Sequence, residues 1–152
     1  MKFQSILFTL FAATQVASES CKKMAGGVVS NCGNNQDAFF LKNVKLMGKP
    51  ARGSELKIQV DGVVRETINP GAKVTIKIKR QGRTLINITK DICELLVERK
   101  VGYKCPVKAQ KISKTHVLKI PGYAPRGDYD IEASGVNKNN RRIFKVNIKA
   151  TI

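Results

Sequence analysis

The sequence predicts an all-β fold, an immunoglobulin-like antiparallel β-sandwich of about seven strands. Apolar residues alternate with polar residues through several short segments, as they do in strands that bury one face. Turn signals rich in Gly, Pro and Asn separate these segments. No stretch of ten or more residues has the apolar stripe of an amphipathic helix. Strands with one polar face are typical of antiparallel sheets, and two such sheets can bury their apolar faces against each other.

The first three expected strands lie in the first half of the chain. Residues 39–47 alternate imperfectly and end at the turn Gly48-Lys49-Pro50. In residues 56–60 and 74–78, every second residue is Leu, Ile or Val and the residues between them are polar or charged. The turn Asn69-Pro70-Gly71 separates these two segments. Each of them is predicted to be a half-buried strand.

Four more strands are expected in the second half. Residues 84–89 and 115–120 have a less regular pattern, whereas residues 129–134 and 144–150 alternate cleanly. Between them, residues 92–97 can form one helical turn at most. The sequence has no internal repeat and no linker, and its length suits a single domain.

The N-terminus has the pattern of a secretory signal peptide. Lys2 precedes a short apolar run over residues 3–13, and the small residues Val16-Ala17-Ser18 follow. The run is shorter than the roughly 20 apolar residues that cross a bilayer. We therefore expect a signal peptide at residues 1–18 and a mature, soluble domain at residues 19–152, with a membrane anchor or an N-terminal strand as alternatives.

The charge is strongly unbalanced. The chain has 28 Lys and Arg against 11 Asp and Glu, a net charge of +17, and only Lys2 of these lies in the expected signal. This excess is larger than solubility requires and predicts an anionic partner, such as a membrane surface or an acidic polymer. Nucleic-acid binding would call for aromatic residues interleaved with basic ones on one face, and the sequence has no such platform. We expect no nucleic-acid partner.

Four cysteines and one glycosylation sequon fit an oxidising compartment. Two disulfides are expected, and proximity favours Cys21 with Cys32 and Cys93 with Cys105, although spacing alone allows three pairings. A metal site is not expected, because the chain has no Cys-x-x-Cys motif and a single histidine. Asn87 begins the Asn-Ile-Thr sequon and is a candidate glycosylation site.

Motifs for catalysis are missing from the sequence. The single histidine, His116, lies in a strand-like run and has no nucleophile that the sequence brings near it. No Gly-x-Ser-x-Gly or phosphate-binding glycine loop is present, and Asp128 with Asp130 fits a polar strand edge. We expect a protein that is not an enzyme, with no catalytic residues and no cofactor.

Several motifs occur in a fixed order between Asn31 and the C-terminus. They are Leu56-Lys-Ile-Gln-Val60 with Gly62; Gly71-Ala-Lys-Val-Thr-Ile-Lys-Ile78; Asp91-Ile-Cys-Glu-Leu95; Cys105-Pro-Val107; and Ile120-Pro121 leading to Pro125-Arg-Gly-Asp-Tyr129. In this order and spacing they resemble the ML lipid-recognition domain family, and within it the fungal phosphatidylglycerol/phosphatidylinositol transfer proteins. The Niemann-Pick type C sterol carrier belongs to the same family.

The resemblance implies a carrier of the secreted or vacuolar/lysosomal lumen, whose two sheets open to take a lipid between them. It implies intermembrane transfer of a phospholipid or sterol, without chemistry on the lipid. Cys93 and Cys105 match a pair that the family bridges. Cys32 matches a cysteine that the family joins to the last strand, where this chain has a residue near Phe144 instead. Cys21 is then the available partner.

The inward residues of the expected strands are candidate lipid contacts, because acyl chains can replace core side chains there. We expect contacts at Ile58, Val60, Val74, Ile76, Ile78, Leu95, Val107, Ile120, Tyr129, Phe144 and Val146. For each of them, packing against protein alone is the alternative. The outward lysines would dock a monomeric carrier on anionic membrane. The alternative function is a secreted basic module that binds an anionic polymer or a receptor without lipid transfer.

Overall fold

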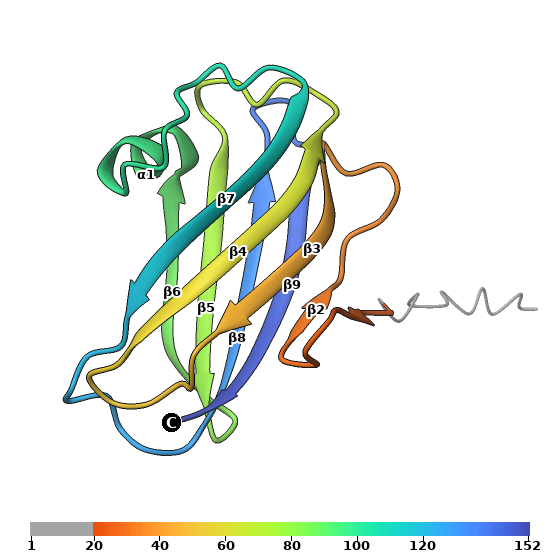
Figure 1. The fold of residues 1–152 in the computed structure, drawn as a ribbon. Coiled ribbons are helices and arrows are strands. Elements are labelled where there is room, and N and C mark those ends of the chain that lie inside the picture. Colours follow the sequence, from red (N-terminus) through yellow and green to blue (C-terminus); the bar gives the residue numbers. More distant parts are fainter. Residues whose placement is uncertain (1–19) are drawn as a thin grey trace, which may run out of the picture.

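The computed structural model describes residues 20–152, and the expected signal peptide at residues 1–18 lies outside them. This part of the chain forms two antiparallel β-sheets that pack face to face, with one short helix at one end (Figure 1). The elements are β1 (Lys22–Lys23), β2 (Val29–Asn31), β3 (Phe39–Met47), β4 (Glu55–Val64), β5 (Lys73–Arg80), β6 (Arg83–Asp91), α1 (Ile92–Glu98), β7 (Gln110–Lys119), β8 (Asp128–Val136) and β9 (Arg142–Thr151).

The larger sheet has the order β1-β2-β9-β8-β5-β6, and the smaller sheet has the order β3-β4-β7. In Figure 1 the three strands of the smaller sheet cross obliquely in front of the larger one. The all-β sandwich is confirmed, and each of the seven expected strands is present. Two further strands, β1 and β2, are only two and three residues long, too short to show an alternation in the sequence.

The helix is longer than the sequence suggested. One turn at most was expected at residues 92–97, but α1 has seven residues, close to two turns. The expectation was wrong because local capping adds stability that apolar periodicity does not reveal. The side chain of Asp91 caps the helix by accepting a hydrogen bond from the Glu94 N–H at 3.0 Å.

Both disulfides that proximity favoured are formed. Cys21 is bonded to Cys32, which lies just after β2. Cys93 of α1 is bonded to Cys105, in the segment between α1 and β7. The second bridge therefore ties the helix to the segment that leads into β7.

The strand register shows which residues point between the sheets. Residues opposite each other in antiparallel strands share a face, and we call the face toward the other sheet the inner face. In the smaller sheet one inner row is Val44, Val60 and Lys114, and the next is Leu46, Ile58 and His116. In the larger sheet Ile76 lies opposite Ala133 and Ile88, and Ala133 lies opposite Val146.

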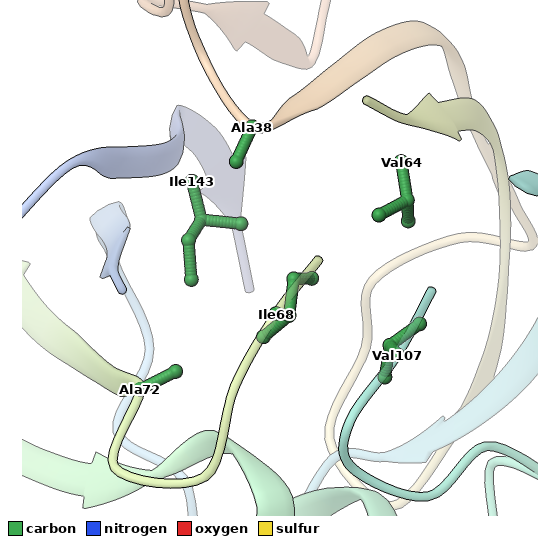
Figure 2. Close-up of a cluster of buried hydrophobic side chains, with 6 residues drawn as sticks. All are labelled: Ala38, Val64, Ile68, Ala72, Val107 and Ile143. Carbon is green, nitrogen blue, oxygen red and sulfur yellow. The ribbon is translucent and has the colours of Figure 1, made fainter. Parts of the chain in front are cut away.

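Two apolar clusters fill much of the interior. The first lies near α1 and consists of Ala38, Val64, Ile68, Ala72, Val107 and Ile143, which Figure 2 shows converging from both sheets and three connecting segments. The second consists of Val29, Leu41 and Val44, with Ile58, Val146 and Ile148 packed on it. The second cluster joins β2, β3 and β9, so it closes the side of the sandwich where β3 lies against the larger sheet.

Candidate binding cavity

An apolar cavity of about 250 Å³ lies between the sheets at the end where α1 packs. Its wall comes from both sheets, the helix and two connecting segments. The strands contribute Phe39, Val60, Val64, Ile112, Lys114, His116, Ile143 and Phe144. The helix contributes Ile92 and Leu96, and the connections contribute Ile68, Val101, Tyr103 and Val107. Four of these residues, Val64, Ile68, Val107 and Ile143, belong to the buried cluster of Figure 2.

Two glycines let aromatic rings lie close against the backbone of the two sheets. A Cβ atom on Gly62 of β4 would stand 2.6 Å from the Phe39 ring, and a Cβ atom on Gly135 of β8 would stand 2.7 Å from the Phe144 ring. Only a residue without a side chain allows so close an approach. Both rings form part of the cavity wall. The glycines thus set the position of the two aromatic walls.

The helix closes one end of the cavity with a single face. Ile92 and Leu96 are four residues apart, so they lie on the same side of α1, and both line the cavity. After the helix, Val101, Tyr103 and Val107 point to the cavity. The residues that alternate with them, such as Lys104 and Lys108, are exposed. This segment therefore has an apolar inner side and a basic outer side.

The sandwich is open on the side of β6 and β7, the edge strands of the two sheets. Ile86 and Ile88 of β6 lie opposite Ile78 and Ile76, which places them on the inner face, yet they are 41% and 42% exposed. Leu118 of β7 lies opposite the buried Leu56 and is 42% exposed. Inner-face residues are buried in a closed sandwich. The exposed aliphatic side chains therefore mark an apolar mouth along the β6–β7 side.

Two polar side chains stand on the otherwise apolar wall. Lys114 and His116 occupy inner-face positions of β7, opposite Val60 and Ile58. Both line the cavity, with Lys114 exposed and His116 half-buried. The Lys114 ammonium lies over the Tyr103 ring, with its Nζ 5.3 Å from the ring centroid. Because β7 is an edge strand, these two groups belong to the mouth.

The eleven candidate contacts from the sequence fall in three places. Val60, Val107 and Phe144 lie in the cavity wall. Ile58 and Val146 pack on the second apolar cluster. The other candidates are not among the lining residues: Val74, Ile76 and Ile78 of β5, Leu95 of α1, and Ile120 and Tyr129.

Among the candidates outside the cavity wall, Tyr129 has a clear structural partner. Its hydroxyl donates a hydrogen bond to the Pro125 carbonyl oxygen at 2.6 Å, and it lies opposite Ala150, two residues from the C-terminus. Leu95 is one residue away from the lining Leu96, which is about 100° around the helix axis.

The sequence analysis did not identify most of the residues that line the cavity. Most of these missed residues belong to the helix, to the connecting segments or to β7. The spacing of Ile92 and Leu96 was a signal, as was the alternation of Val101, Tyr103 and Val107 with polar residues. Ile68 lies in a loop and pairs with Val107 through an isolated bridge. No local sequence pattern predicts a bridge between residues so far apart in the chain.

Elsewhere on the described surface, the other hollows are lined largely by polar and charged residues. The largest of those described, about 750 Å³, is lined mainly by Lys, Asn and Ser side chains near residues 20–43. Within residues 20–152 no three His, Cys, Asp or Glu side chains gather as metal ligands would. The helix in this part of the chain is not long enough to cross a membrane.

Comparison with known protein families identifies the family of this chain. The family model of the ML domain matches residues 27–152, most of the chain. The chain belongs to the ML-domain family. A solved structure that this ML domain resembles is the Niemann-Pick type C2 protein from Japanese carpenter ant, with a TM-score of 0.63 and 16% identity over 82% of this chain and 98% of that one. At this identity the likeness shows the shared fold.

Curated relatives of this ML domain are fungal proteins named phosphatidylglycerol/phosphatidylinositol transfer protein. The protein from Neurospora crassa is 33% identical over 94 residues, which is 62% of this chain and 52% of that protein. The one from Emericella nidulans is 32% identical over 114 residues, 74% of this chain and 66% of that protein. The chain therefore spans between half and two thirds of the length of these relatives, whose names describe transfer proteins rather than enzymes.

Proposed function

We propose that this ML domain binds a phospholipid or sterol between its sheets and transfers it between membranes. The observation that carries the proposal is the apolar cavity with its mouth between β6 and β7. The names of the fungal relatives support a phospholipid ligand. Transfer of this kind is a binding process, in which apolar burial of about 0.8 kcal/mol per methylene holds the lipid. We assign no reaction and no cofactor to the chain.

Lipid uptake requires the cavity to widen. Its volume of about 250 Å³ is below the roughly 300–1,000 Å³ of sites for drug-sized ligands, and a phospholipid is larger still. The β3 side is closed by the second apolar cluster, whereas the inner-face isoleucines of β6 are already partly exposed. We therefore expect β6 and β7 to move apart while the β3 side stays packed.

Membrane docking is assigned to the basic segment next to the cavity. Arg99, Lys100, Lys104 and Lys108 are exposed, and this segment also places Val101 and Tyr103 in the cavity wall. A Lys or Arg near an anionic membrane contributes about 1 kcal/mol of attraction. Docking through this segment would bring the cavity end to the lipid surface. We propose that the chain acts there as a monomer.

We further propose that residues 1–18 are a signal peptide and that Asn87 carries a glycan in the secreted, vacuolar or lysosomal lumen. Asn87 is exposed on β6 and lies opposite Lys77, between the inner-face Ile86 and Ile88. It therefore points to the outer face of the larger sheet, where a glycan leaves the mouth free. After secretory expression, glycosidase should reduce the mass of the wild type but not of Asn87→Gln. Equal masses before and after treatment would contradict the glycan.

The function is tested by purifying the chain from a secretory host and identifying lipid extracted from it by mass spectrometry. We expect close to one phospholipid or sterol per protein. Ile112→Asp places a charge in the cavity wall and should abolish binding, because the wall cannot solvate it. Val117→Asp adds the same charge to the outer face of the same strand, at a 48% exposed position, and should bind normally.

The control for folding is Leu96→Trp, which fills the cavity without adding charge. It should reduce lipid uptake while its circular dichroism spectrum stays that of the wild type. A wild type that carries no lipid and takes none from vesicles would contradict the proposal. If that protein bound heparin in a salt-sensitive way, the result would instead support the alternative function, a basic module that binds an anionic polymer through its large positive net charge.

A further inference from the structure

We propose that Lys114, assisted by His116, binds the phosphate of an anionic lipid headgroup at the cavity mouth and so selects anionic over zwitterionic phospholipids. This inference rests on the proposed lipid-binding function and names the part of the site that decides its ligand. It assigns the acyl chains to the apolar wall and the headgroup to two inner-face positions of β7.

The placement of the two side chains is unusual for their chemistry. The inner face of the smaller sheet is otherwise apolar in the rows of Val44 with Val60, Leu46 with Ile58, and Leu56 with Leu118. Lys114 and His116 complete the first two of these rows. A lysine on β7 could point to solvent without cost by occupying an outer-face position, as Lys111 and Lys119 do. On the inner face, Lys114 carries its charge to the edge of an apolar cavity.

Lys114 has no acidic partner in the described part of the chain. The contact recorded for its ammonium is the Tyr103 ring, and no carboxylate lies within salt-bridge distance of it. Asp61, on the neighbouring strand, accepts a hydrogen bond from Ser113 on the outer face, 2.6 Å between the oxygens. The ring holds the ammonium at the mouth through a cation–π contact and leaves its hydrogen-bond donors available.

These donors suit a phosphate diester. With the acyl chains in the cavity, the headgroup of a bound lipid lies at the mouth, where a Lys ammonium and an imidazole N–H can donate to phosphate oxygens. A net anionic headgroup leaves the Lys114 charge paired when the lipid displaces water. A choline headgroup adds a second cation near it, and a sterol leaves it without a counter-charge. Affinity should therefore follow headgroup charge.

The test compares Lys114→Met with Lys111→Met, two variants that lose the same charge from the same strand. Each protein is incubated with vesicles of equal parts phosphatidylglycerol and phosphatidylcholine with identical acyl chains, then separated and extracted, and its lipids are measured. The wild type and Lys111→Met should retain mainly phosphatidylglycerol. In Lys114→Met the ratio of phosphatidylglycerol to phosphatidylcholine should fall roughly tenfold, because one charge-assisted contact is lost. His116→Gln should give a smaller fall.

The possible outcomes distinguish a failure of headgroup selection by Lys114 from a failure of lipid binding itself. Failure of the wild type to take up either lipid would contradict lipid binding itself. Uptake without headgroup preference, or equal ratios in the Lys114 and Lys111 variants, would overturn the inference and leave lipid binding standing. A control titration uses inorganic phosphate alone. Shifts at His116 in the NMR spectrum that match those caused by phosphatidylglycerol would show a site for free phosphate and overturn the headgroup assignment.

Discussion

At the scale of single residues, the shape of the cavity depends on two glycines as well as on the side chains that line it. Gly62 and Gly135 lie on opposite sheets, and each gives space to an aromatic ring of the cavity wall, Phe39 and Phe144. A methyl group at either position would overlap a ring atom. Such overpacking typically costs about 1–3 kcal/mol and moves side chains away from their preferred rotamers.

Gly135→Ala is therefore expected to displace the Phe144 ring, lower the free energy of unfolding by about 1–3 kcal/mol and reduce lipid uptake. Urea unfolding and uptake of a fluorescent phospholipid measure the two effects. Gly122→Ala is the control, because a Cβ at Gly122 meets no atom within 4 Å. Wild-type stability and uptake in Gly135→Ala would refute the role given to the glycine.

Ile143 is the most deeply buried large side chain of the core, at 1% exposure, and it also borders the cavity. Ile143→Ala should lower the free energy of unfolding by about 2–5 kcal/mol, since it enlarges an existing void. Val97→Ala, at a helix position that is 59% exposed, should change it by less than about 0.5 kcal/mol. Chemical denaturation of both variants checks this. Equal losses would mean that Ile143 does not belong to the core.

At the scale of elements, α1 and the segment after it form the end wall of the cavity. The bridge between Cys93 and Cys105, two positions that are 12 apart in the sequence, fixes their separation. In the chain-entropy description, a loop of this size stabilises the fold by about 3 kcal/mol. The same loop contains Val101 and Tyr103 of the wall, so this bridge supports both the fold and the site.

Removing this bridge with Cys93→Ala and Cys105→Ala should cost about 3 kcal/mol of stability and also weaken lipid retention. The matched control removes Cys21 and Cys32, which are 11 residues apart and lie outside the cavity wall. That variant should lose comparable stability and still retain lipid. Thermal unfolding and extracted-lipid content report on the two properties. Equal retention in the two variants would argue against a role for the first bridge in the wall.

At the scale of the whole molecule, net charge is expected to govern binding to the membrane surface, whereas apolar burial is expected to govern retention of the lipid. In the proposed function, the large positive net charge attracts the domain to anionic vesicles over a distance that salt screens. In the proposed function, a lipid between the sheets would be retained by burial of apolar surface, which salt does not weaken.

Co-sedimentation with phosphatidylglycerol vesicles should therefore fall steeply as salt rises, while the lipid content of the already loaded protein stays constant. Phosphatidylcholine vesicles serve as the control and should capture little protein at any salt concentration. Loss of the bound lipid in step with loss of vesicle binding would show that one electrostatic interaction accounts for both.

The sequence by itself determined the fold class, the seven principal strands and the favoured disulfide pairing, because alternation and close cysteines are local signals. Of the candidate contacts named from the sequence, Val60, Val107 and Phe144 lie in the cavity wall. Only the tertiary structure decided that Ile58 and Val146 fill one side of the sandwich while Ile112 and Leu96 face a hollow on the other. An inward position in a strand is a local property, whereas a cavity is the space left between strands, helix and loops that are distant in sequence.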